Sequence, residues 1–113
     1  MEKEYQHYEN KTKDEVLKLI KEFGSKDNML ENQNDSPSVE EFLQLADDYP
    51  AIVYHGYIIK KPRTDFRVAI EGFIISSLTA EQALDIMHEY AYADECDYQK
   101  EKNGTFTIRT WWD

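Results

Sequence analysis

A run of alternating apolar residues at 51–77 restricts the fold more than any other feature of this chain. Between 52 and 59, β-branched and aromatic residues follow a period of two, which is typical of a β-strand. The segment 61–65 is charged and contains Pro62, which cannot continue a ladder of backbone hydrogen bonds. The alternation resumes from 66 to 74. The sequence therefore predicts a β-hairpin at the centre of the fold.

The register of this hairpin follows from the positions of its polar side chains. Placing Lys60 opposite Phe66 gathers the polar groups of both strands on one face, with His55 directly across from Glu71. A slip by one residue would mix polar and apolar groups on both faces. The other face is then aliphatic and suited to cover by a helix. Its residues are Ile52, Ile58, Val68, Ile70 and Ile74.

Length and charge limit the possible functions. At 113 residues the chain is long enough for one domain and too short for two. It has 23 Asp or Glu residues against 13 Lys or Arg, so its formal net charge is −10. A charge of this sign repels nucleic acids and anionic membrane surfaces and attracts basic partners. We therefore expect no direct binding to nucleic acid or to membranes.

The same composition bears on cellular location. No apolar stretch resembles a signal peptide, and none approaches the roughly 20 residues that span a bilayer. Cys96 is the single cysteine, which excludes an internal disulfide and agrees with a reducing compartment. The sequence therefore predicts a cytoplasmic protein.

Three capping boxes mark the starts of three helices. A Ser or Thr is followed three residues later by Glu or Gln at 12–15, 38–41 and 79–82, and apolar residues three and four apart follow each box. The polar segment 1–11 has no such pattern and is left unassigned. The segment 25–37, rich in Asn, Asp and Ser, is predicted to be a linker or mobile loop.

Asn103-Gly104 lies between two further alternating segments and predicts a second hairpin. We therefore expect a single α+β domain over 12–113, in the order α-α-β-β-α-β-β. It would have a four-stranded, mainly antiparallel sheet with the third helix packed on one face. Two alternatives stay open for the first two helices: they either cover the opposite face or pack beside the third helix.

The polar face of the sheet is one candidate site. It combines aromatic and charged residues of the kinds enriched at binding hot spots. Left uncovered, it would form an interaction surface, including one for homodimerisation. Covered by the first two helices, it would hold only a cross-strand contact between His55 and Glu71. The residues of this candidate site are His55, Tyr57, Glu71, Arg109 and Trp111.

Catalytic and metal chemistry find little support. A carboxylate beside His55 would raise the pKa of the imidazole and prepare it for proton transfer, but no nucleophile motif or phosphate-binding glycine loop accompanies the pair. The ligand-type residues between His88 and Asp97 match neither zinc spacing nor a calcium loop. We therefore expect no enzyme activity, no cofactor and no metal site.

The distribution of charge is the most distinctive feature. Seven acidic residues lie between 27 and 59 and seven more between 68 and 99, and neither stretch contains Lys or Arg. Ordinary surface helices intersperse the two signs, so this acidity either only keeps the protein soluble or serves to bind a basic partner. We adopt the second interpretation: an inhibitor or regulator that imitates nucleic acid toward a basic, nucleic-acid-binding protein. The predicted contact residues are Glu40, Glu41, Asp47, Asp48, Glu81, Asp85, Glu89, Asp94 and Glu95.

Overall fold

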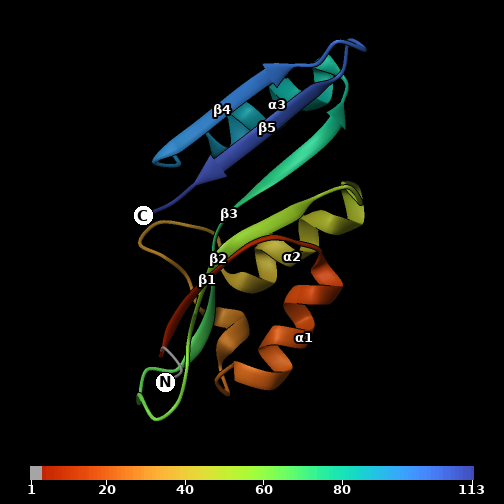
Figure 1. The fold of residues 1–113 in the computed structure, drawn as a ribbon. Helices are drawn as coiled ribbons and strands as arrows, with labels where there is room; N and C mark the ends of the chain where they lie inside the picture. The colour runs from red at the N-terminus through yellow and green to blue at the C-terminus, as the bar shows by residue number, and fades with distance from the viewer. Residues whose placement is uncertain (1–3) are drawn as a thin grey trace.

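The computed structural model describes residues 4–113 as one five-stranded antiparallel sheet with three α-helices on the same face (Figure 1). The strands lie in the order β1-β2-β3-β5-β4. In chain order the elements are β1 (Tyr5–Lys11), α1 (Lys13–Phe23), the 3₁₀ helix η1 (Asn28–Leu30), α2 (Val39–Asp48), β2 (Val53–Ile59), β3 (Arg67–Leu78), α3 (Ala80–Tyr90), β4 (Glu95–Lys100) and β5 (Phe106–Trp111).

The three predicted helices are confirmed, and each begins at its predicted capping box. The side chains of Thr12, Ser38 and Thr79 each accept a hydrogen bond from the backbone N–H three residues later. In return, the Glu or Gln at that position accepts from the N-cap backbone, so two otherwise unpaired donors are satisfied at each helix start.

The predicted number of four strands is wrong, because the N-terminal segment left unassigned contains a fifth strand, β1. This strand pairs antiparallel with β2, from Tyr5 opposite Ile59 to Tyr8 opposite Gly56. Most of its side chains are exposed, as at a sheet edge, and only Tyr8 is buried. The Tyr8 hydroxyl donates a 2.7 Å hydrogen bond to the backbone oxygen of Ala69 and so joins β1 to β3.

The predicted register of the central hairpin holds for half of its length. Pairing runs as expected up to Gly56 opposite Ile70, but a β-bulge then inserts one extra residue into β3. His55 consequently lies opposite Gly72 rather than Glu71. Gly72 fits there because a Cβ atom would lie 2.0 Å from the backbone oxygen of Thr110 and 2.5 Å from His55 Nε2. Beyond the bulge, each side chain of β3 lies on the face opposite to the predicted one. Ile74 therefore does not lie on the helix-covered face, to which it was assigned.

An aromatic group forms the centre of the main core, where α2 and α3 meet the sheet. The Trp112 ring lies 5.3 Å from that of Phe42 in α2, and the Phe73 ring of β3 lies 5.4 Å from that of Tyr90 in α3. The Tyr54 hydroxyl donates a 2.6 Å hydrogen bond to the backbone oxygen of Phe42, which fixes α2 on β2. Both α2 and α3 are therefore attached to the sheet through this aromatic group.

The segment 25–37 runs along the part of β3 that β5 does not reach, since β5 pairs with β3 only from Ile74 onward (Figure 1). The side chain of Asn28, 1% exposed, takes the place of a strand there. Its Oδ1 accepts from the backbone N–H of Val68 at 2.8 Å, and its Nδ2 donates to the backbone oxygen of Val68 at 3.0 Å. Farther on, Gln33 accepts a hydrogen bond from the Tyr57 hydroxyl at 3.0 Å, so the segment reaches the second sheet face.

Candidate functional site

The acidic residues of α2 and α3 act on a common group of tyrosines. Tyr49 directly follows α2, and burial raises the pKa of its hydroxyl above the ordinary value. The charges of Asp48, Asp85 and Glu89 raise that pKa further. Since Asp48 belongs to α2 and the other two to α3, carboxylates from both helices contribute to the electrostatic field at the same hydroxyl.

Two tyrosines at the end of α3 extend this arrangement. Burial raises the pKa of Tyr92, and the charges of Glu41, Glu89 and Asp35 add to the effect. Tyr90 behaves in the same way, with burial first and Glu89 and Glu41 among the further causes. We call the combined surface the acidic seam. It consists of Asp35, Glu41, Asp48, Asp85 and Glu89 around Tyr49, Tyr90 and Tyr92.

The acidic seam is not neutralised from within the part of the chain that the structure describes. Its five carboxylate residues are exposed, and none takes part in an ion pair with another described residue. Hydrogen bonding to Ser38 lowers the pKa of Glu41, which keeps this carboxylate ionised. Tyr92 is 54% exposed and places an aromatic side chain among the negative charges.

The other predicted contact residues have different surroundings. Asp47 turns toward α1, where its Oδ1 lies 3.6 Å from Lys13 Nζ. Asp94 accepts a hydrogen bond from the backbone N–H of Asp113 at 2.7 Å, and it lines a shallow hollow beside Asp35 and Tyr92. Three more are exposed, with no contact to the acidic seam that the structure identifies. These are Glu40, Glu81 and Glu95.

Sequence reasoning found four of the five carboxylates of the acidic seam and missed Asp35 and the three tyrosines. A local signal was present, because Tyr49 directly follows Asp48 and Tyr90 directly follows Glu89. Helix periodicity assigns such tyrosines to the core, and Tyr90 is indeed 7% exposed. Only the fold reveals that charges from both α2 and α3 act on them.

The second candidate site, on the other face of the sheet, is covered differently from either expectation. Helices α1 and α2 pack on the same face as α3, so they do not cover it. Tyr5 of β1 instead stacks on Tyr57 with ring centroids 5.2 Å apart. The Tyr57 hydroxyl also accepts a 2.9 Å hydrogen bond from Arg67, and the residue is only 6% exposed. Tyr57 is therefore engaged within the domain.

The predicted pair of His55 and Glu71 is wrong, because the bulge separates them along the strand. His55 instead stacks on Trp111, with ring centroids 4.4 Å apart, and its Nε2 lies 3.0 Å from the backbone oxygen of Thr110. Burial lowers the pKa of His55 to about 4, with a smaller contribution from the charge of Arg109. The imidazole is therefore neutral at pH 7, and the expected rise in its pKa is not found.

Glu71 is also buried away from solvent. It is 7% exposed, and its Oε1 has no hydrogen-bond partner among the described residues. The closest basic group is His7, whose Nδ1 is 3.8 Å from that oxygen. Burial raises the pKa of the Glu71 carboxyl, which His7 lowers only in part. Asp97 and Arg109, farther along this face, form a more exposed pair at 3.8 Å.

We expect His55 to make the stability of the domain depend on pH. Its pKa is about 4 in the folded state and about 6.5 in the unfolded state, so between these values only the unfolded chain takes up the proton. The contribution is fully present above pH 6.5 and is lost as the pH falls toward 4, a change of about 3 kcal/mol. Urea denaturation of the wild type and of His55→Gln between pH 7 and 4 measures this difference.

The His55→Gln variant should lose less stability than the wild type between pH 7 and 4. Parallel pH curves for the wild type and His55→Gln would contradict the assignment.

Glu71 has the opposite effect on the pH dependence of stability, because a raised carboxyl pKa favours the folded state at low pH. The variant Glu71→Gln should therefore be more stable than the wild type at pH 7, and this advantage should shrink on acidification.

No protein-family model, no curated protein and no solved structure matches this chain. Within residues 4–113, none of the helices is long and apolar enough to cross a membrane. Over the same part of the chain, no three His, Cys, Asp or Glu residues come together in a group that could hold a metal ion. The charge and geometry of the described surfaces are therefore the features that point to a function.

Proposed function

We propose that this protein is a non-enzymatic inhibitor or regulator that binds a basic protein through the acidic seam. The observation that carries the proposal is that carboxylates of α2 and α3 act on the same tyrosines, although Asp48 and Asp85 are 37 positions apart in the sequence. Charges brought together in this way produce one field rather than several scattered ones. Such a field accelerates the encounter with an oppositely charged surface and excludes acidic proteins.

The tyrosines define the kind of basic surface that fits. Arginine side chains bind carboxylates through two parallel hydrogen bonds and also stack on aromatic rings. Tyr92 is exposed and lies in the electrostatic field of Glu41 and Glu89, so a guanidinium group could stack on its ring while it is attracted by these carboxylates. The partner surface should therefore contain arginines rather than only lysines.

Nucleic-acid-binding proteins are the class in which such surfaces are common. Asp85 and Glu89 lie one helical turn apart on α3, a separation of about 6 Å that is comparable with the spacing of phosphates along a strand. A folded domain with this spacing can occupy a cleft that otherwise holds DNA or RNA. Inhibition by competition with nucleic acid follows from that geometry.

An interaction module or homodimer built on the opposite sheet face is the weaker alternative. Its aromatic residues already have partners inside the domain, since Tyr57 is bound by Gln33 and Arg67 and Trp111 stacks on His55. The contacts that a partner would need are therefore largely occupied.

The test is an affinity capture from the source cell at low ionic strength, followed by elution with a salt gradient. We expect basic, arginine-rich proteins to be retained and to elute at moderate salt, because the Debye length shrinks from about 30 Å at 0.01 M to about 8 Å at 0.15 M. Added DNA or RNA should displace them. The proposal would be contradicted if neither salt nor added nucleic acid changed the amount of protein retained.

A further inference from the structure

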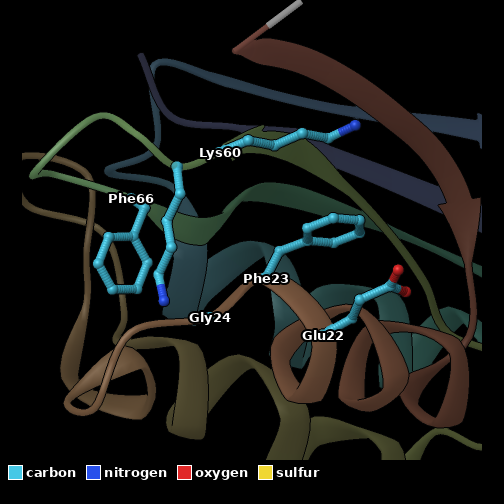
Figure 2. Close-up of a pocket in the computed structure, with 6 residues that line it drawn as sticks. Glu22, Phe23, Gly24, Lys60 and Phe66 are labelled. Atoms are coloured by element: carbon cyan, nitrogen blue, oxygen red, sulfur yellow. The ribbon is translucent and has the colours of Figure 1, made fainter. Parts of the chain in front are cut away.

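A cleft of about 230 Å³ lies between the C-terminal end of α1 and the turn that joins β2 to β3. Figure 2 shows its two phenyl rings, Phe23 from the helix end and Phe66 from the start of the returning strand, on opposite sides of the opening. It is separate from the acidic seam and shares no residue with it. The cleft is lined by Glu22, Phe23, Gly24, Lys60, Lys61 and Phe66.

Two ammonium groups lie against these rings. Lys60 Nζ is 5.0 Å from the centroid of the Phe23 ring, and Lys61 Nζ is 4.8 Å from that of Phe66. Contacts of this kind hold the cations in place without removing their charge. The two lysines thus bring two positive charges to one cleft of a strongly acidic protein.

Neither charge is neutralised by a carboxylate in the described part of the chain. Within residues 4–113, no Asp or Glu oxygen lies within 4.0 Å of Lys60 or Lys61. The acidic residue of the turn, Asp65, is bound instead by Arg63, with contacts of 2.7 and 2.9 Å, and by Arg67. The ammonium groups therefore keep their capacity to bind an external anion.

The backbone around the cleft is fixed before any ligand binds. The N–H of Gly24 donates to the backbone oxygen of Ile20 at 2.8 Å, and the N–H of Lys60 donates to that of Glu4 at 2.7 Å. A Cβ atom at Gly24 would meet the same Ile20 oxygen at 2.5 Å, so the helix end packs too closely for any other residue. A preorganised wall reduces the entropy lost on binding.

We propose that this cleft binds a small aromatic anion, with its phosphate or carboxylate paired with one of the two ammonium groups, which lie on separate rings, and its flat body in the opening between Phe23 and Phe66. The volume falls below the range of about 300–1,000 Å³ typical of drug-sized ligands and equals roughly eight water molecules at about 30 Å³ each. A single ring bearing one acidic group has this size. Glu22 at the margin opposes excess negative charge, which favours a ligand with a single acidic group (Figure 2).

The experiment is a titration of the full chain, followed by ¹H–¹⁵N NMR, with phenyl phosphate and with benzoate. We expect saturable shifts of the Gly24, Lys60, Lys61 and Phe66 amides with at least one of the two, and the stronger binder identifies the acidic group. Inorganic phosphate and phenol each carry half of the proposed ligand and should bind at least about tenfold more weakly. Equal binding of inorganic phosphate, or no saturable shift with either aromatic anion, would overturn the proposal.

Three variants separate the cleft from general attraction to positive charge. Replacing Lys60 and Lys61 together with Gln should weaken binding at least about tenfold, whereas Lys102→Gln, an exposed position on the β4–β5 turn, should leave it unchanged. Glu22→Gln should tighten binding, because it removes a negative charge from the margin. Equal losses in the cleft variant and Lys102→Gln would contradict the assignment. Unchanged circular dichroism spectra would verify that each variant is folded.

Discussion

Replacing Trp112 with alanine should lower the free energy of unfolding by about 3–5 kcal/mol. The side chain is 2% exposed, and its ring lies 5.3 Å from that of Phe42, 6.0 Å from Tyr90 and 5.6 Å from Tyr92. Its removal would leave a cavity where α2 and α3 meet the sheet. Because a domain of this size has a total stability of about 5–15 kcal/mol, urea denaturation should show a much earlier midpoint.

The neighbouring Trp111 is the matched control. It lies half-buried on the opposite face, stacks on His55 and donates a 3.0 Å hydrogen bond to Asp113. Alanine at this position should lower stability by only about 1–2 kcal/mol. Trp112→Phe should also be mild, since it keeps a ring and removes an Nε1 that has no partner among the described residues. Similar losses for the two alanine variants would contradict the description of the core.

The helices were predictable because their signals are local. A capping box occupies four consecutive residues, and the apolar stripe that follows each box extends over about three turns. The Asn103-Gly104 turn was equally local, and the hairpin of β4 and β5 forms around it. Features that depend on a few neighbouring residues could therefore be identified from the sequence.

The edge strand and the bulge were not predictable in this way. In β1 only Tyr8 is buried, so the alternation that indicates a strand is missing, and the segment becomes a strand only because β2 offers it an edge. The bulge at Glu71 was hidden because β3 is apolar on both faces. Gly72, which permits the close approach of the His55 ring, was the one indication that pairing is unusual there.

The candidate site was predictable as a composition but not as an arrangement. The two long acidic stretches are evident in the sequence, yet neighbouring residues such as Asp47 and Asp48 face different elements, because each residue turns 100° around a helix. Asp47 meets Lys13 of α1, whereas the charge of Asp48 acts on Tyr49 together with charges from α3. Which carboxylates lie together is decided by the core around Trp112, whose contacts are distant in sequence.

If the proposed function is correct, reversing the charge of three residues of the acidic seam should abolish binding of the proposed basic partner. The change is Asp48→Lys, Asp85→Lys and Glu89→Lys, at positions that are all exposed. Each reversal replaces an attraction of roughly 0.5–1 kcal/mol by a repulsion of similar size, so three together should weaken the complex at least about 100-fold. The assay is retention from the cell extract at low salt, compared with the unchanged protein.

The fold should tolerate these three substitutions. Asp48 is the last residue of α2 and Glu89 lies in the last turn of α3, where a positive charge interacts favourably with the helix dipole. A second triple variant with Glu4→Lys, Glu9→Lys and Asp27→Lys has the same net charge and alters exposed positions outside the acidic seam. It should retain most of the binding, because the proposed partner would respond to the local field of the acidic seam. If both variants lost binding equally, total charge alone would account for the attraction and the acidic seam would have no specific role.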